Sequence, residues 1–217
     1  MLITGKSTDG PVSKYLNRKI STRITKIIIK YHVPLTPNQI SLISFILGIA
    51  STLSYIYVNP IVAGILVQLS SIIDGVDGEL ARALNKTSKK GGFIDAILDR
   101  ITDIAIIAGL TTYIVLSEIL NPILILHIAI LAITGDLMVS YLHARGEASL
   151  GIHPLKIGTI PSIASRDVRL FIIFSGSIIG VMDKNIYWIT LIIIAMISYV
   201  YVALKTIEIY VKYQEEK

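Results

Sequence analysis

Six apolar segments, separated by short polar turns, make up most of the chain beyond residue 37. They run over about residues 38–57, 61–83, 92–116, 121–143, 166–181 and 187–210. Most of them approach or exceed the ~20 residues that a helix needs to cross the hydrocarbon core of a bilayer. The pattern predicts an all-α integral membrane protein with six transmembrane helices.

The stretch between Pro11 and His32 has a different pattern. Apolar residues recur there at helical spacing, and lysines and arginines, Arg18 among them, fill the other side. This predicts an amphipathic helix on the membrane surface with its basic face toward lipid headgroups, although a soluble helix packed on the protein itself has the same periodicity. Thr36 and Pro37 then supply the cap and the first turn of the next helix. We therefore expect a cytoplasmic N-terminal segment over residues 1–35 and a membrane domain over residues 36–217.

Composition and charge agree with a membrane protein, since 53% of the residues are hydrophobic and 16% are charged. The absence of cysteine excludes disulfide bonds and thiolate metal sites. The net charge of +5 is explained more simply by basic cytoplasmic loops than by nucleic acid, so no nucleic-acid partner is expected. Basic residues gather at residues 11–30, 86–90, 145–169 and 212–217, whereas the opposite turns hold one lysine, Lys184. The positive-inside rule therefore predicts a multi-pass cell-membrane protein with both termini and the 86–90 turn in the cytoplasm.

Two of the apolar segments contain four carboxylates, which are Asp74, Asp77, Asp95 and Asp99. The first two are three residues apart and the last two are four apart, so each pair shares one face of a helix. The polar turn at 85–91 would bring the two faces together, and clustered carboxylates repel one another unless cations bind them. Hard divalent ions such as Mg2+ prefer carboxylate oxygens, which predicts a site for one or two metal ions. A proton or cation pathway, and structural ion pairs with Arg82 and Arg100, are the alternatives.

Small residues surround these carboxylates. Gly75 and Gly78 clear one side of the first helix, and Gly91 clears the start of the second. Such space admits a neighbouring backbone or a bulky phosphate ligand. Arg82 follows one turn after Gly78 and can bind a phosphate through two N–H groups. Carboxylates for metal and an arginine for phosphate indicate phosphoryl-transfer chemistry.

The spacing of these residues resembles the signature of the CDP-alcohol phosphotransferases. Every position of that signature is filled, in the order Asp74-x2-Asp77-Gly78-x2-Ala81-Arg82-x8-Gly91-x3-Asp95-x3-Asp99. The resemblance implies an integral membrane enzyme that transfers a substituted phosphate from a CDP-linked donor to an acceptor hydroxyl and releases CMP. It also favours a homodimer.

The same resemblance implies roles for particular residues. The four aspartates would hold two divalent ions, with Mg2+ expected and Mn2+ as the alternative, and Asp99 would also be the base for the acceptor hydroxyl. The start of the first span, TPNQIS, is similar to a segment that encloses the cytidine group in the family. Ordinary helix capping is the alternative role for Pro37 and Asn38. The implied CDP-binding residues are Pro37, Asn38, Asp74, Gly78, Arg82 and Ser88.

The connection between the fourth and fifth segments contains four basic residues, which are Arg145, Lys156, Arg166 and Arg169. Arg166 and Arg169 are one turn apart, and such a group can bind the phosphate of a phosphorylated acceptor. Basic residues at a membrane edge also serve simply as topology determinants. The segments ARGEASLG and SRDVR are similar to the basic pocket of family members whose acceptor is an inositol phosphate.

The stretch TDGPVSKYLNRKIST, residues 8–22, resembles one subgroup, the archaeal di-myo-inositol-phosphate-phosphate synthases. The implied reaction transfers phosphoinositol from CDP-inositol to inositol 1-phosphate. An alternative within the family transfers a phosphatidyl or archaetidyl group from a CDP-lipid to inositol phosphate. A cation transporter built on intramembrane carboxylates is the alternative from another class.

Other polar residues attract less specific interpretations. His32, His127, His143 and His153 share no metal-ligand spacing, so no zinc site is expected. Asp103 lies one turn beyond Asp99, and Asp136 lies on another span. Both are expected to contact the metal ligands or the basic cluster rather than the metal itself.

Overall fold

The computed structural model describes residues 9–215, and every regular element in that range is helical. A π-helical turn (Ser13–Asn17) leads into α1 (Arg18–Lys30), and a 3-10 turn (Pro154–Lys156) lies between α5 and α6. The remaining helices are α2 (Pro37–Tyr57), α3 (Pro60–Ala83), α4 (Lys89–Leu116), α5 (Pro122–Leu150), α6 (Arg166–Ile179) and α7 (Asn185–Glu215). Each predicted segment is therefore a helix, while residues 1–8 of the expected N-terminal segment and the last two residues lie outside the described range.

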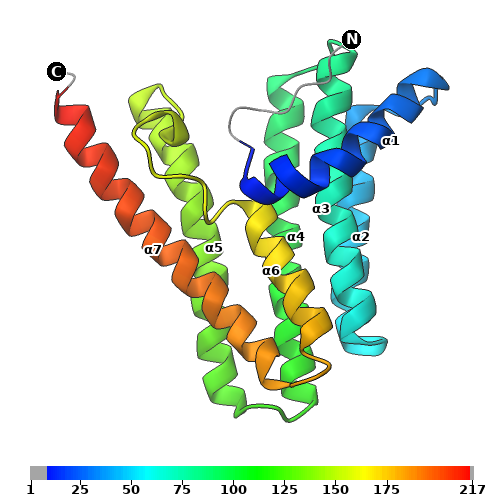
Figure 1. Ribbon diagram of the computed structural model, residues 1–217, viewed down its shortest axis with the longest axis vertical. Coiled ribbons are helices and arrows are strands. Elements are labelled where there is room, and N and C mark those ends of the chain that lie inside the picture. Colours follow the sequence, from blue (N-terminus) through cyan, green and yellow to red (C-terminus); the bar gives the residue numbers. More distant parts are fainter. Residues whose placement is uncertain (1–8, 216–217) are drawn as a thin grey trace.

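Helices α2 to α7 run alongside one another, and α1 crosses α3 (Figure 1). Four of them, α2, α3, α5 and α7, are long and apolar enough to cross a membrane. The other two predicted spans, α4 and α6, differ from these in composition or in length. α4 carries Asp95, Asp99, Arg100 and Asp103 toward its N-terminal end. α6 has 14 residues, about 21 Å at the usual helical rise, against a hydrocarbon core of about 30 Å.

One continuous apolar core holds α4 in place. Ile106, Leu110 and Ile114 are fully buried and belong to a cluster to which all six helices from α2 to α7 contribute. A Cβ at Gly109 would lie 3.0 Å from the Cα of Thr52, so α2 and α4 approach more closely than a larger residue allows. This packing fixes the rotation of α4, and with it the face that carries Asp95 and Asp99.

Helix α1 packs on α3 through a face that combines polar residues with buried Ile28. Its residues Ser21 and Thr25 are buried, and both hydroxyls donate to the carboxylate of Glu79 on α3, at 2.7 and 2.8 Å. Arg18 Nη1 lies 2.7 Å from the same carboxylate, and its Nη2 lies 2.8 Å from Asp9. Burial lowers the pKa of Arg18, but its bonds to Asp9 and Glu79 outweigh that effect and raise the pKa above its usual value, so the guanidinium stays charged. Arg18 therefore points into the protein, whereas the sequence pattern predicted it on the face toward lipid headgroups.

Replacing Glu79 is expected to loosen α1. In Glu79→Ala the buried hydroxyls and Arg18 lose their shared acceptor, and we expect a loss of roughly 2 kcal/mol in the free energy of unfolding. The thermal unfolding midpoint in detergent micelles measures this effect, with Glu147→Ala, an exposed glutamate of α5, as the matched control. Equal midpoints for the two variants would show that Glu79 does not anchor α1.

Candidate active site

Three carboxylates from α3 and α4 meet at one point. One oxygen each from Asp74, Asp95 and Asp99 lies within 4.8 Å of the others. Asp95 and Asp99 occupy successive turns of α4, whose start is fixed by the Ser88 hydroxyl accepting the Gly91 N–H at 3.0 Å. Carboxylate oxygens in this arrangement are the donor set that a hard divalent cation such as Mg2+ or Mn2+ takes. The cluster therefore fits a metal ion.

The fourth predicted ligand, Asp77, lies beside this group of three. It is 8% exposed, and the hydroxyl of Ser41 on α2 donates a short hydrogen bond to its Oδ2. Asp77 and Asp95 both line the two cavities that meet at this site. Asp77 and Asp95 thus belong, with Gly78 and Arg82, to the lining that the two cavities share.

The smaller cavity has a volume of about 200 Å3 and is enclosed by α2, α3 and the turn before α4. Its lining includes five of the six predicted CDP-binding residues, namely Pro37, Asn38, Gly78, Arg82 and Ser88. The sixth, Asp74, lines the larger cavity instead. Arg82 Nε and Nη2 are buried and have no hydrogen-bond partner within residues 9–215. Unpaired guanidinium N–H groups in a cavity are suited to an anion such as a diphosphate.

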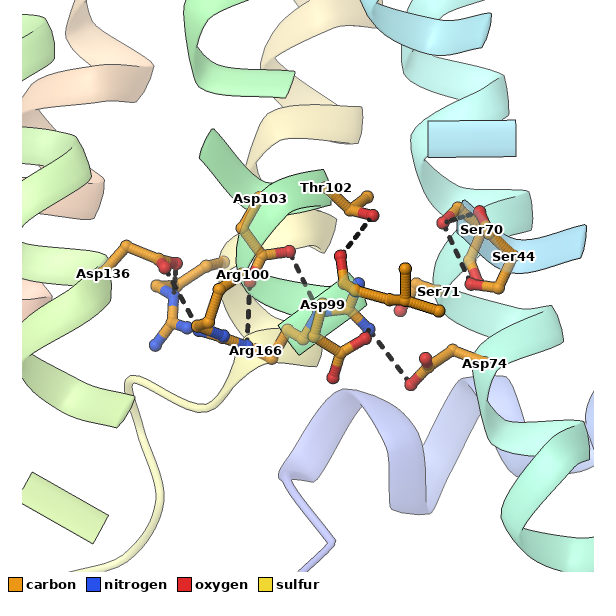
Figure 2. A network of polar contacts seen from close by, with 12 residues as sticks. Ser44, Ser70, Ser71, Asp74, Asp99, Arg100, Thr102, Asp103, Asp136 and Arg166 are labelled. Atoms are coloured by element: carbon orange, nitrogen blue, oxygen red, sulfur yellow. Dashed lines mark hydrogen bonds and ion pairs between the residues drawn. The ribbon is translucent and has the colours of Figure 1, made fainter. Parts of the chain in front are cut away.

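The larger cavity, of about 360 Å3, is lined by all four carboxylates. Arg166, at the start of α6, lies against them: its Nη1 is 3.0 Å from both Asp74 and Asp99, and its Nε is 2.9 Å from Asp103 (Figure 2). Arg169, one turn later, places Nε 2.6 Å from Asp136 of α5. Arg166 and Arg169, which were both predicted to bind the phosphate of the acceptor, therefore line this cavity.

Arg100 connects the two arginines through shared carboxylates (Figure 2). Its Nη2 lies 3.0 Å from Asp103, and its Nη1 lies 3.2 Å from Asp136. Asp103 and Asp136 thus each lie between two guanidinium groups, so the arginines and carboxylates of this part of the bundle alternate in one network. Such alternation compensates buried charges that would be costly alone.

The other two residues that were predicted to bind the phosphate of the acceptor lie elsewhere. Arg145 and Lys156 are exposed and do not line either cavity. α5 continues past Arg145 to Leu150 and ends at Gly151, whose φ of +70° closes the helix. The structure therefore brings two of the four basic residues to the cavity.

Several residues that line the larger cavity had no assigned role from the sequence. The N-terminal segment supplies Asp9, Ser13 and Asn17, and it is tied to α6 by the Ser13 N–H, which donates to Asp167 at 2.5 Å. His143 and His153 also line it. These residues lie far from the aspartates along the chain, so no local sequence pattern indicates that they belong to the site.

Residues 34–211 match the CDP-alcohol phosphatidyltransferase family, and the chain belongs to it. Among its relatives is the bifunctional IPC transferase and DIPP synthase of Thermococcus kodakarensis, 43% identical over 76% of this chain and 36% of that protein. The archaetidylinositol phosphate synthase of Pyrococcus horikoshii is 34% identical over 80% of this chain and 86% of that protein. The chain thus spans little more than a third of the bifunctional relative's length.

The fold is also found in solved structures. The phosphatidylinositol phosphate synthase of Mycobacterium tuberculosis with CDP-DAG bound superposes with a TM-score of 0.71 at 23% identity, covering 88% of this chain and 94% of that one. The same synthase in complex with manganese and citrate gives a TM-score of 0.70 at 21% identity over 88% of this chain and 89% of that one. At these identities the similarity shows a shared fold.

Proposed function

We propose that this chain catalyses the metal-dependent transfer of phosphoinositol from CDP-inositol to inositol 1-phosphate, with release of CMP. The observation that carries the proposal is a group of carboxylates at the lining that two cavities share. Arg82, with its unpaired N–H groups, lines both cavities, while Arg166 and Arg169 line the larger one. Such an arrangement would bring a donor diphosphate and a phosphorylated acceptor to the same metal ligands.

The relatives' names support inositol phosphate as a substrate, because both a DIPP synthase and an archaetidylinositol phosphate synthase are among them. The larger cavity suits this acceptor, which both candidate reactions share. Among the residues that line it, only Val139 and Leu155 have apolar side chains. A lining of this kind suits a hydroxyl-rich, phosphorylated group. Transfer of an archaetidyl group from a CDP-lipid is the second candidate, favoured by the shared fold with a synthase that binds CDP-DAG.

We propose that Asp74, Asp77, Asp95 and Asp99 hold two divalent ions, most simply Mg2+, with Mn2+ as the substitute. Bound there, the ions would polarise the donor diphosphate. Arg82 supplies N–H groups to the same diphosphate, and the residues around it enclose the CDP portion. Those residues are Pro37, Asn38, Asp74, Gly78 and Ser88.

In the proposed reaction Asp99 accepts the proton of the acceptor hydroxyl. The hydroxyl oxygen then forms a bond to the phosphorus distal to cytidine, the bond from that phosphorus to the bridging oxygen breaks, and CMP leaves with the electron pair. Arg166 lies against Asp99, with its Nη1 3.0 Å from the carboxylate. Arg166 and Arg169 orient the acceptor, and Arg145 and Lys156 remain predicted contributors at the outer edge.

We further propose that α2 to α7 all cross the membrane. α4 and α6 run alongside the four long apolar helices (Figure 1). The exposed side of α1 combines apolar Ile20 and Ile27 with basic Lys19 and Lys26, a mixture suited to the interface. In this arrangement residues 1–35 form the N-terminal segment, residues 36–217 form the membrane domain, and both termini and the site face the cytoplasm. A homodimer in the bilayer completes the proposal.

CMP release by the purified protein tests the function. With Mg2+ and inositol 1-phosphate present, we expect release from CDP-inositol and little from a CDP-lipid. Release from the CDP-lipid alone would assign the chain to phospholipid headgroup synthesis. Ion flux across liposomes without nucleotide, together with no release from either donor, would favour the transporter.

A further inference from the structure

Two histidines that the proposed reaction does not yet use line the larger cavity. His143 lies on α5, and His153 lies in the connection after it; their ring centroids are 5.0 Å apart. The two residues meet because α5 ends at Gly151 and the chain turns back along the helix. The pair is therefore a product of the local fold, and both rings line the cavity.

Hydrogen bonds fix the orientation of each ring. Nδ1 of His153 accepts the backbone N–H of Leu155 at 3.2 Å, so the ring proton of the neutral form lies on Nε2. Burial lowers the pKa of His153 below its usual value, which favours this neutral form. Within residues 9–215, Nε2 of His153 has no hydrogen-bond partner. Nε2 of His143 lies 2.9 Å from the hydroxyl of the fully buried Tyr201, which holds the neighbouring ring in place.

Several charged groups surround the pair. Arg169, Lys205 and Arg100 act on His143. Lys156 and Lys205 act on His153, opposed by Glu147. Arg169 and Arg100 pair with Asp136, and Lys205 pairs with Glu208, so the Nε2–H of His153 is the donor left for an anion in this part of the cavity. Asp74 and Asp99, which line the same cavity, repel an anion and already engage Arg166.

We propose that His153 donates its Nε2–H to the phosphate of the acceptor and thereby selects a phosphorylated polyol. The assignment rests on the proposed function for the identity of the acceptor. His143, held by Tyr201, is a positioning residue that fixes the ring of His153. The acceptor then spans the cavity, with its phosphate among the histidines and Arg169 and its attacking hydroxyl at Asp99.

Binding and kinetics of three variants test this assignment. Isothermal titration of inositol 1-phosphate into purified protein with Mg2+ and CMP gives Kd without turnover, and CMP release gives KM for acceptor and donor separately. Loss of a hydrogen bond to a charged group is expected to raise the acceptor Kd and KM roughly tenfold or more in His153→Leu. His153→Gln keeps an N–H donor near the same place and is expected to recover most of that loss. His127→Leu, which changes an exposed histidine of α5, is the control for the chemical change and is expected to bind as wild type does.

Titration with unphosphorylated inositol identifies the group that is bound. If His153 contacts the phosphate, His153→Leu leaves the Kd of inositol unchanged. An equal rise for inositol and inositol 1-phosphate, an equal rise in the donor KM, or wild-type affinity in His153→Leu would each overturn the assignment. The expected binding pattern without CMP release from any donor would refute the proposed reaction and retain the phosphate subsite.

Discussion

Asp99→Asn is expected to abolish turnover while leaving CDP binding largely intact. Asp99 is one of three carboxylates within 4.8 Å of one another, and it lies beside the cavity assigned to the acceptor. Its amide would accept no proton from the acceptor hydroxyl and would bind a divalent ion more weakly. Loss of a general base alone slows a reaction by about 100- to 10,000-fold, and we expect the upper end of that range. CMP release measures turnover, and titration with CMP measures nucleotide binding.

A matched control and a metal titration separate the two roles of Asp99. Asp183→Asn makes the same chemical change at an exposed residue between α6 and α7 and is expected to retain full activity. If Asp99 served only as a metal ligand, excess Mg2+ or Mn2+ would restore the variant. We expect no such recovery, and full activity in Asp99→Asn would refute the assignment of the base.

The helices of this fold could be predicted from the sequence because their signals are local. Thr36 and Asn59 each accept a backbone N–H at the start of a helix, and a proline follows each of them. The ends of the helices were harder to predict than their positions. The fourth apolar segment was expected to end near residue 143, but α5 continues for almost two turns to Leu150 before Gly151 closes it.

The aspartates of the site could be predicted for the same reason. Asp74 and Asp77, and Asp95 and Asp99, share helix faces through their spacing, and a short turn brings the two helices together. The partners of these residues could not be predicted from the sequence. Arg166 reaches Asp74 from 92 positions away, and His143 meets His153 only because the chain turns back after α5. Such contacts depend on how helices pack, which no spacing records.

The direction of α1 shows a limit of amphipathic patterns. A helix on the membrane surface with its basic side toward lipid headgroups was expected, yet Ser21 and Thr25 are buried beside Ile28, and Ile27 is 55% exposed. The single buried carboxylate of Glu79 explains the difference, because it offers acceptors to several donors of α1 at once. Periodicity identifies a helix face without identifying the polar partner that makes its burial favourable.

Arg166→Ala is expected to impair the acceptor far more than the donor. The guanidinium contacts three carboxylates, at 3.0 Å from Asp74, 3.0 Å from Asp99 and 2.9 Å from Asp103. Its removal leaves these charges uncompensated and takes a phosphate-binding group from the cavity wall. Truncating one partner of a buried, hydrogen-bonded charge pair costs roughly 2 to 5 kcal/mol, so we expect kcat/KM for the acceptor to fall roughly a hundred- to a thousandfold.

Arg166→Lys and Arg23→Ala complete the comparison. Lysine keeps the charge but cannot place N–H groups against three carboxylates at once, so an intermediate loss is expected. Arg23 is exposed on α1, and its removal is expected to leave both KM values unchanged. Steady-state CMP release, with each substrate varied at saturating levels of the other, separates the effects on donor and acceptor. An unchanged acceptor KM in Arg166→Ala would remove Arg166 from the acceptor site and leave it only a structural partner of Asp103.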